Sequence, residues 1–391
     1  MKVLVAGGGS GGHVTPVLAV VNELSKHDTS LSVQFVCDRK FASLSREIMS
    51  HAKVPVDIKV ILAGKLRRYH NVPLYQQLLD IPTMLLNIRD VFLLLAGMIQ
   101  SLWLLLRSRP EVIFTKGGFV CLPVGLAAAV LRIPLVVHDS DSHPGLTNRI
   151  LARYATKIAT GAPLDNYDYP KAKTTYVGIP IDESFQPISI KKQRQFKAEL
   201  GLPDITWPVV VVTGGGLGAA RINQAILQIV PELLEAKIAV VHVTGTSQYA
   251  KVAAAATEHP AYIVKPFVSD GMYRLIGAAD VVVTRAGATA LLEVAAMAKP
   301  TIIIPNGMLT GGHQLKNAHV YEQADAALVL DEKQLAAQPY QLLTAIELLL
   351  HDHKRAEQLG TAMQAFAKPD AALDVAQLIV AAATDNGEGR V

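Results

Sequence analysis

Two clusters of glycine directly follow apolar runs in this chain, at residues 7–12 and 214–218. Glycine has no Cβ, so the backbone N–H groups of such a loop can approach a phosphate closely. When a helix follows the loop, its amino end adds partial positive charge at the same place. Both clusters therefore predict binding sites for anionic groups such as a diphosphate.

An imidazole side chain, His13, stands directly after the first cluster. Its ordinary pKa lies near neutrality, which suits it to take a proton from an attacking hydroxyl group. His13 can alternatively bind an anion or cap the loop. The sequence leaves these three roles for His13 open, and we rank the proton acceptor first.

The first cluster also matches the fingerprint of dinucleotide-binding loops, through Gly7, Gly9 and Gly12. Asp38 closes the next apolar run, where the fingerprint has an acidic residue for a ribose. One dinucleotide would not require the second glycine cluster. A dinucleotide-dependent oxidoreductase is therefore kept as an alternative of a different class.

Short apolar runs alternate with stretches of helical periodicity in both halves of the chain. This rhythm predicts an α/β protein with two Rossmann-like domains, each a doubly wound parallel sheet. A polar stretch with several prolines separates the halves, so we expect domains at residues 1–165 and 166–369. We expect a last helix near residues 370–385, which can pack back on the first domain. Because ligands of such sheets bind beyond the carboxyl ends of the strands, we expect the domains to face a central cleft.

The composition excludes some classes of function. The 391 residues carry a formal net charge of +4, and only 6% are aromatic, so nucleic acid is not an expected partner. The two cysteines, Cys37 and Cys121, lie in apolar surroundings and are expected to be buried side chains rather than a disulfide or metal ligands. The first apolar run begins at residue 2, which predicts a protein without an export signal.

Several motifs occur together in one order, and the set closely resembles the MurG family of peripheral-membrane N-acetylglucosaminyltransferases of peptidoglycan synthesis. The motifs are residues 7–13, 116–119, 138–148, 214–218, 285–293 and 313–318. The resemblance implies the GT-B fold, with UDP-N-acetylglucosamine (UDP-GlcNAc) bound mainly by the C-terminal domain and a lipid acceptor by the N-terminal domain. It implies transfer with inversion to the C4 hydroxyl of undecaprenyl-pyrophosphoryl-N-acetylmuramoyl-pentapeptide (lipid I), giving lipid II without a cofactor. Another GT-B enzyme that uses a UDP-sugar, such as a glycolipid transferase or an epimerase, is the nearest alternative.

The resemblance also assigns site residues. On the donor side they are Gly216, Val268, Ala288, Thr289, Ala290, Leu291, Leu292, Glu293 and Gln314. On the acceptor side they are Ser10, Gly11, Gly12 and Asp141, with His13 as the catalytic base. Glu293 is the leading donor residue, since a carboxylate accepts hydrogen bonds from both ribose hydroxyls. Arg285 is expected either to add a cation near the diphosphate or to form an ion pair within its own domain.

Two carboxylates, Asp139 and Asp141, are alternative bases. Their spacing imitates the Asp-x-Asp motif that holds a divalent metal in another class of glycosyltransferase, and His138 and His143 flank them. We expect no metal, because the duplicated glycine loops supply positive charge in its place and no further ligand pair completes a zinc site.

Four residues depart from the family pattern. Asp141 stands where many relatives have asparagine, Gly216 where they have serine, His313 where they have glutamine, and Asp182 where arginine is frequent. At position 216 the loss of a hydroxyl leaves only backbone contacts to the diphosphate.

Residues 65–109 combine cations with leucine-rich helical stretches. The cations are Lys65, Arg67, Arg68, Arg107 and Arg109. This combination predicts binding to an anionic membrane surface, at the cytoplasmic face and peripherally. The apolar run 91–106 is expected to be too short to span a bilayer, and a buried core helix is the alternative for it. We expect the more exposed part to comprise Leu78, Leu79, Ile81, Met84 and Leu85.

Overall fold

The computed structural model describes residues 1–8, 11–65, 80–140, 144–214, 219–307 and 312–384. It divides the chain into two compact units, Met1–Asp182 with the segment from Asp370 onward, and Glu183–Pro369. The first boundary lies after Asp182, later than the position after residue 165 that the prolines suggested. The reason is a short strand beyond that position, which still pairs with the first sheet.

The first unit is built on a parallel seven-stranded sheet with the order β3-β2-β1-β4-β5-β6-β7. Its strands are β1 (Lys2–Ala6), β2 (Ser32–Asp38), β3 (Val56–Ile61), β4 (Val112–Thr115), β5 (Leu135–Asp139), β6 (Lys157–Thr160) and β7 (Thr174–Tyr176). The central strands are short and almost wholly apolar, as expected for a parallel sheet covered on both faces. In register, Val5 lies between Phe35 of β2 and Phe114 of β4.

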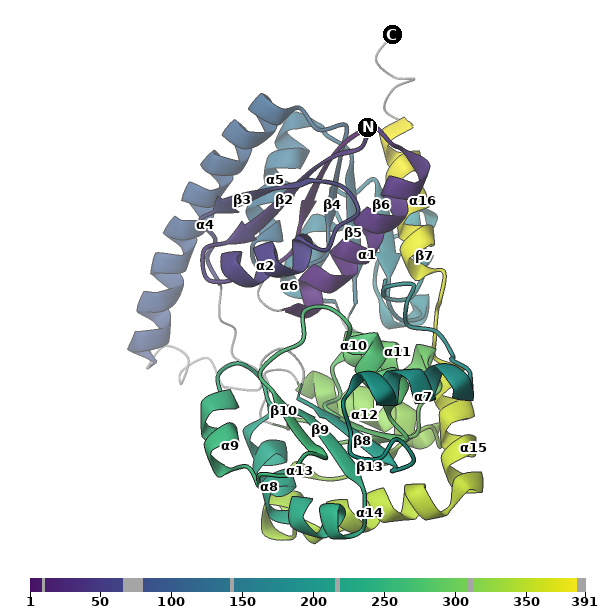
Figure 1. Ribbon diagram of the computed structural model, residues 1–391. Helices are drawn as coiled ribbons and strands as arrows, with labels where there is room; N and C mark the ends of the chain where they lie inside the picture. Colours follow the sequence, from purple (N-terminus) through teal and green to yellow (C-terminus); the bar gives the residue numbers. More distant parts are fainter. Residues whose placement is uncertain (9–10, 66–79, 141–143, 215–218, 308–311, 385–391) are drawn as a thin grey trace. The chain divides into compact units, whose positions relative to one another are not determined.

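Helices cover both faces of this sheet (Figure 1). They are α1 (Gly11–His27), α2 (Ala42–Met49), α4 (Ile81–Ser108), α5 (Cys121–Leu131), α6 (Leu146–Leu151) and α16 (Ala371–Thr384). One apolar core joins residues of α1, α2 and α16 to the sheet, and a second joins α4, α5 and α6 to the other face. The last helix, α16, packs beside α1 and places Val375 and Ile379 in the first core.

The second unit repeats the plan with a six-stranded parallel sheet in the order β10-β9-β8-β11-β12-β13. The strands are β8 (Val209–Thr213), β9 (Ala239–Val243), β10 (Tyr262–Lys265), β11 (Val281–Thr284), β12 (Thr301–Ile303) and β13 (Leu328–Val329). The helices are α7 (Ile190–Glu199), α8 (Ala220–Glu235), α9 (Tyr249–Ala255), α10 (Met272–Ala278), α11 (Ala288–Ala296), α12 (His313–Gln323), α13 (Glu332–Ala337), α14 (Tyr340–His351) and α15 (His353–Gln364). The expected pair of doubly wound parallel-sheet domains is confirmed.

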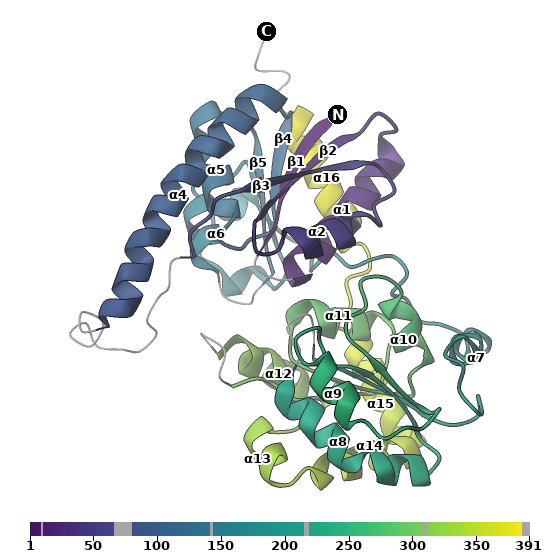
Figure 2. The same cartoon turned by 60° about the vertical axis from the view of Figure 1, so that its left-hand side comes forward.

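Helix α4 differs from expectation in length and exposure. It runs for 28 residues, and its part from Pro82 to Ser108 is long and apolar enough to cross a membrane by length and composition. The argument that residues 91–106 are too short to span was therefore wrong, since the helix begins well before them. Figure 2 shows its amino-terminal half projecting past the sheet of its own unit.

One face of α4 is anchored in the first unit, chiefly against α5. Gly97 lies so close to the backbone of Leu62 that a Cβ there would be 1.9 Å from the carbonyl oxygen. Ser101 is buried on the same face, and Gln100 accepts a hydrogen bond from the Leu62 N–H at 2.8 Å. The helix is thus neither a fully buried core element nor detached from its domain.

Both cysteines are buried and free. The thiol of Cys121 lies against backbone carbonyl oxygens, and burial raises its pKa to about 12. Neither cysteine forms a disulfide, in agreement with the expectation from the sequence.

Candidate active site

In the first unit the order of the strands reverses between β1 and β4, and ligands of open parallel sheets bind beside such a point. The first glycine loop leaves β1 there, and the loop after β4 packs directly on it. A Cβ added to Gly118 would lie 2.4 Å from the Gly8 carbonyl oxygen, and one added to Gly7 would lie 2.7 Å from that of His13. Only glycine allows these backbones to come so close.

His13 lies in the first turn of α1, at the positive end of a 17-residue helix. Its side chain is half-buried, and the ring Nδ1 is shielded from solvent. Gly11 and Gly12 begin the same helix, with Gly12 exposed. Ser10 lies outside the described residues. The structure therefore brings the candidate base to the carboxyl edge of the first sheet.

The end of β5 carries a buried polar cluster. His138 is completely buried, with its Nε2 2.8 Å from the Gly178 carbonyl oxygen and its Nδ1 3.3 Å from the Ser140 hydroxyl. The ammonium of Lys116, buried after β4, donates to the same hydroxyl. Burial, with a smaller contribution from the Lys116 charge, holds the pKa of His138 well below its usual range.

Asp139, one of the alternative bases, is buried and accepts a hydrogen bond from the Tyr169 hydroxyl at 2.7 Å. This makes the carboxylate poorly placed to take a proton from an incoming substrate. The second alternative, Asp141, and the flanking His143 lie outside the described residues. Within the parts of the chain that the structure describes, no group of three His, Cys, Asp or Glu side chains has the arrangement of a metal site.

The second unit has its reversal of strand order between β8 and β11. Three helices, α8, α11 and α12, start after strands of that central region, β8, β11 and β12. Gly214 follows β8, whereas Gly216 lies outside the described residues. The space around the α-carbon of Gly287, at the start of α11, is open, since a Cβ there would meet nothing within 4 Å.

Helix α11 carries most of the donor residues that the family resemblance assigns. Ala288, Thr289 and Ala290 form its half-buried first turn, and Glu293 is half-buried one turn later. Their neighbours Leu291 and Leu292 are buried, and Leu291 belongs to the apolar core. A ligand can therefore contact these two leucines only through their backbone. The sequence alone did not distinguish backbone contacts from side-chain contacts at these positions.

Two further assigned residues lie at other strand ends. Val268, after β10, is partly buried and packs against the apolar core. Gln314, in the first turn of α12, accepts a hydrogen bond at its Oε1 from the Asn306 N–H at 2.8 Å. This bond fixes the orientation of the Gln314 amide. Its NH₂ group therefore remains as the donor for a further contact.

Arg285 forms an ion pair inside its own domain. Its guanidinium donates to the Glu332 carboxylate and, at 3.1 Å, to the Ile304 carbonyl oxygen. Arg221, in the first turn of α8, binds the second oxygen of Glu332 at 2.9 Å. The side chains of Arg285 and Glu332 are almost completely buried. Of the two roles expected for Arg285, the intradomain ion pair is the one observed.

Sequence reasoning gave no role to Lys116, Tyr169 or Glu332. Lys116 stood within a recognised motif, but its hydrogen bond to a residue 24 positions later depends on the order of the strands. Glu332 is 47 residues from Arg285, so its pairing has no local signal.

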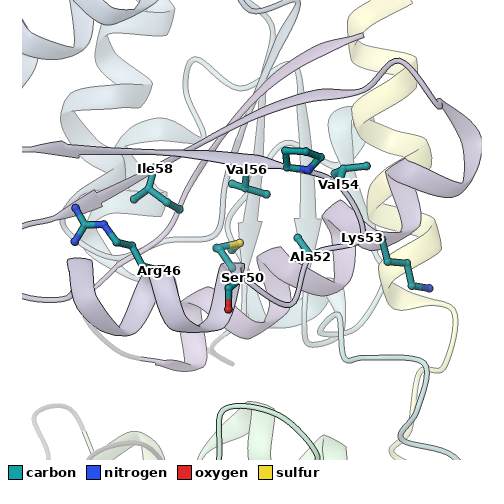
Figure 3. A pocket seen from close by; sticks show the side chains of 9 residues that line it. Arg46, Ser50, Ala52, Lys53, Val54, Val56 and Ile58 are labelled. Atoms are coloured by element: carbon teal, nitrogen blue, oxygen red, sulfur yellow. The ribbon is translucent and has the colours of Figure 1, made fainter.

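A cavity of about 510 Å³ lies on the first unit, between the end of α2 and the start of edge strand β3 (Figure 3). Met49 and Val56 contribute apolar surface, and Arg46 and Lys53 lie toward opposite sides of it. Since it is lined by the start of β3 rather than by the carboxyl ends of the strands, it is separate from the glycine loops.

Comparison with known families gives two matches. Residues 3–160 match the glycosyltransferase family 28 N-terminal domain, and residues 209–375 match the glycosyltransferase family 28 C-terminal domain. Two curated relatives are both named UDP-N-acetylglucosamine–N-acetylmuramyl-(pentapeptide) pyrophosphoryl-undecaprenol N-acetylglucosamine transferase. The protein from Bacillus licheniformis is 32% identical over 375 residues, covering 95% of this chain and 96% of its own. That from Halalkalibacterium halodurans is 32% identical over 382 residues, covering 97% and 99%.

Solved structures share the fold. MurG from Acinetobacter baumannii superposes with a TM-score of 0.66 at 20% identity, covering 97% of this chain and 99% of its own. UDP-GlcNAc 2-epimerase from Neisseria meningitidis gives a TM-score of 0.62 at 12% identity, covering 97% and 100%. At such identities the superpositions establish the two-domain architecture, which transferases and epimerases have in common.

Proposed function

The chain belongs to the MurG family of UDP-GlcNAc-dependent transferases in glycosyltransferase family 28, and on this premise we propose how its residues carry out the family's reaction. The enzyme moves N-acetylglucosamine from UDP-GlcNAc to undecaprenyl-pyrophosphoryl-MurNAc-pentapeptide, converting lipid I to lipid II in peptidoglycan synthesis. The observation that carries this assignment is 32% identity to relatives of that name over 95% of the chain.

The donor binds on the second unit, at the amino ends of α8 and α11. Glu293 accepts hydrogen bonds from the two ribose hydroxyls, and the backbone near Val268 contacts the uracil. This is supported by the half-buried position of Glu293, one turn inside a helix that starts with open space at Gly287. The NH₂ group of Gln314, whose oxygen is already engaged, is the donor that meets a sugar hydroxyl.

The leaving diphosphate is stabilised by the glycine loop before α8. The helix is 16 residues long and begins directly after that loop, so the N–H groups of its first turn and the positive end of its dipole face the diphosphate. Arg221 lies in the first turn and adds a cation nearby. These groups oppose the charge that develops on UDP as its bond to the sugar breaks.

The acceptor binds on the first unit, and His13 is the base. Its Nε2 takes the proton from the C4 hydroxyl while that oxygen forms a bond to C1 of the sugar. In the same step the bond from C1 to the UDP oxygen breaks, and the electron pair leaves with UDP. The position of His13 at the strand-order reversal and the burial of Asp139 support this choice between the candidate bases.

The enzyme acts on a membrane surface, and helix α4 is the element that meets it. Large apolar side chains that are spaced three or four residues apart along α4 form one solvent-exposed stripe. They are Leu85, Ile88, Phe92, Leu95, Ile99, Trp103 and Leu106. Phe92, Ile99 and Trp103 are each at least 65% exposed, compared with 41% for Met84 and 59% for Leu85, so among these residues the more exposed part lies beyond Leu85 and not at residues 84–85 as expected. Leu78, Leu79 and the side chain of Ile81, which belong to the same expectation, lie outside the described part of the chain.

Helix α4 lies in the interface rather than crossing it. Its other face is anchored on α5, so spanning would require the helix to leave its own domain. Near its carboxyl end the Arg107 guanidinium lies over the Trp103 ring, 5.9 Å from its centroid. Lys65 is exposed, whereas Arg67 and Arg68 lie outside the described residues. This combination of apolar stripe and cations fits an anionic surface at the cytoplasmic face.

A transfer assay tests the function. Purified protein is incubated with UDP-GlcNAc labelled in the sugar and with the lipid acceptor in detergent micelles, and the label in the lipid phase is counted. We expect labelled disaccharide lipid only when both substrates are present. Conversion of UDP-GlcNAc to its 2-epimer without label in the lipid would instead identify an epimerase, and no turnover of UDP-GlcNAc in either form would refute both assignments.

A further inference from the structure

A buried asparagine lies at the start of α8, the helix whose amino end we assign to the donor diphosphate. Asn223 belongs to the first turn of α8 and is only 3% exposed. Its Nδ2 donates to the Thr244 carbonyl oxygen at 3.0 Å, and its Oδ1 lies 3.0 Å from the Nε2 of His242. The Nδ1 of His242 lies 3.0 Å from the Tyr262 hydroxyl. These hydrogen bonds connect α8 with β9 and β10.

The hydrogen bonds have one consistent direction, which the Thr244 carbonyl sets. A carbonyl only accepts, so Asn223 must turn its NH₂ group toward Thr244 and its oxygen toward His242. That oxygen also only accepts, so the Nε2 of His242 carries the proton. The Nδ1 of a neutral ring is then an acceptor, and the Tyr262 hydroxyl donates to it. Because a hydroxyl can either donate or accept, Asn223 rather than Tyr262 determines the tautomer of His242.

Thr244 extends this connection to the segment that we assign to the uracil. The residue follows β9 directly and is completely buried. Its N–H donates to the Lys265 carbonyl oxygen at 3.0 Å. Lys265 is the last residue of β10 and stands three positions before Val268. The amide of Asn223 thus joins the first turn of α8 to the end of β10 through a single intervening residue.

A UDP-sugar imposes a fixed spacing on these two segments. Its uracil and its diphosphate are joined through one ribose, so the groups that contact them must be held at a matching separation. A buried hydrogen bond has a narrow range of distance and angle, and it therefore limits the shift of one segment against the other.

We propose that Asn223 is a positioning residue for the donor: its amide holds the amino end of α8 at the separation from the end of β10 that the diphosphate and uracil of UDP require. The proposal rests on the proposed donor site of the second unit and adds a residue to it. Asn223 acts through the two segments that it joins, and its buried side chain is not expected to touch the reacting atoms.

The first experiment tests the direction of the bonds by ¹⁵N-edited NMR of the imidazole rings in the full-length protein, with His242→Gln used to assign the signals. We expect a neutral Nε2–H ring in the wild type at neutral pH, because burial lowers the pKa of His242 to about 4. In Asn223→Leu the ring loses its acceptor, so we expect an Nδ1–H population that donates to the Tyr262 hydroxyl. An Nδ1–H ring in the wild type, or an unchanged ring in the variant, would overturn the proposal.

The second experiment measures UDP affinity by calorimetric titration. Leucine branches at the same carbon as asparagine but neither donates nor accepts a hydrogen bond. We expect Asn223→Leu to raise the Kd for UDP by about tenfold, as for a site whose two halves are misaligned. Wild-type affinity for UDP in this variant would contradict a positioning role.

The lipid-acceptor assay separates the two substrates. In Asn223→Leu the KM for UDP-GlcNAc should rise by about the same factor as the Kd for UDP. The KM for the lipid should change less than about twofold, since we assign the acceptor to the first unit. An equal rise of both KM values would show a general loss of active protein structure and would overturn the proposal.

Tyr262→Phe is the matched control. It removes a buried hydrogen bond from the same set but leaves the bonds of Asn223 to His242 and Thr244 in place. We expect its affinity for UDP to stay within about twofold of wild type. A tenfold loss in this variant as well would mean that any loosening of β9 and β10 weakens binding, and it would refute a specific role for Asn223.

Asn223→Asp decides the question if the leucine variant does not fold. The carboxylate has the shape of the amide and still accepts from His242, but it has no N–H for the Thr244 carbonyl. This change alone should weaken UDP binding severalfold, and wild-type affinity would overturn the proposal. A wild-type protein that does not bind UDP would refute the proposed donor site itself, whereas the NMR result would still decide the direction of the bonds.

Discussion

Arg285 and Glu332 form an ion pair in which the two side chains are only 7% and 6% exposed. Arg285 comes from the loop after β11 and Glu332 is the first residue of α13, so the pair joins that loop to the start of α13 at the carboxyl edge of the second sheet. Arg221 shares the same carboxylate from the first turn of α8. The Glu332 carboxylate thus connects the starts of α8 and α11, the two helices to which we assign donor binding.

Replacing Arg285 by methionine should destabilise the second unit by about 3 kcal/mol, because Glu332 then remains buried with one partner fewer. Arg221→Met should cost less than about 1 kcal/mol, since the Arg221 side chain is 45% exposed and Arg285 still pairs. Urea unfolding of both variants measures the difference. Equal effects of the two substitutions would show that the buried pair is not the dominant contact.

Glu293→Ala should weaken UDP-GlcNAc binding by about tenfold or more, because two hydrogen bonds to a charged acceptor are lost. Calorimetric titration with UDP-GlcNAc measures the affinity, and thermal unfolding should show a smaller stabilisation by UDP-GlcNAc in this variant than in wild type at the same ligand concentration, with none by NAD in either protein. Glu322→Ala is the control, as an exposed glutamate of α12 in the same unit. Stabilisation of the wild type by NAD alone would favour the oxidoreductase alternative.

Two glycines allow a test of where a ligand approaches the backbone. Gly287→Ala should leave stability within about 0.5 kcal/mol of wild type, since the added Cβ meets nothing within 4 Å. It should nevertheless raise KM for UDP-GlcNAc severalfold if the donor occupies that open space. An unchanged KM would exclude close approach of the donor to this residue.

Gly118→Ala should behave in the opposite way. Its φ is +89° and the new Cβ would lie 2.4 Å from the Gly8 carbonyl oxygen, so the two loops must separate. We expect a loss of at least about 2 kcal/mol in stability, measured by urea unfolding. Wild-type stability in this variant would mean that the two loops are not packed against each other.

The apolar stripe of α4 should control membrane binding. The double substitution Phe92→Gln with Ile99→Gln is expected to reduce binding to anionic vesicles by about tenfold or more in a flotation assay, because two side chains no longer enter the interface. Ile190→Gln on α7 is the matched control, since Ile190 is 71% exposed on the other unit. Binding of the double variant at the wild-type level would refute the role of α4.

Acid should destabilise the second unit through His242. This ring bonds to Asn223 and Tyr262, and burial lowers its pKa from 6.5 to about 4. Because the folded-state pKa is lowered, the contribution is complete above pH 6.5 and is lost as the pH falls toward 4. The loss amounts to at most about 3 kcal/mol. Unfolding measured across that range should show a weaker pH dependence for His242→Gln than for wild type.

The sequence predicted the sheets well because parallel strands buried on both faces are apolar throughout, as in residues 209–212. It also directed attention to the loops after β1, β8 and β11, where the glycines and Glu293 stand. These signals are local, since each depends on a short run of residues and on the segment that follows it.

Contacts between distant segments could not be predicted in the same way. The pairing of Arg285 with Glu332 and the bond from Lys116 to Ser140 both depend on which strands are neighbours. Likewise, the pattern of α4 is apolar almost all round, and only its packing on α5 and Leu62 decides which side remains exposed. The burial of Leu291 next to the half-buried Ala290 follows from the direction in which α11 meets the core.

The return of α16 to the first unit affects the order in which the protein can be completed during synthesis. Val375 and Ile379 fill the first core, yet the ribosome makes them only after the whole of Glu183–Pro369. At about 5 to 20 residues per second, the nascent amino-terminal domain waits roughly 10 to 40 seconds for its final helix. During that interval the apolar surface beside α1 is uncovered, whereas the second domain can complete its own core first.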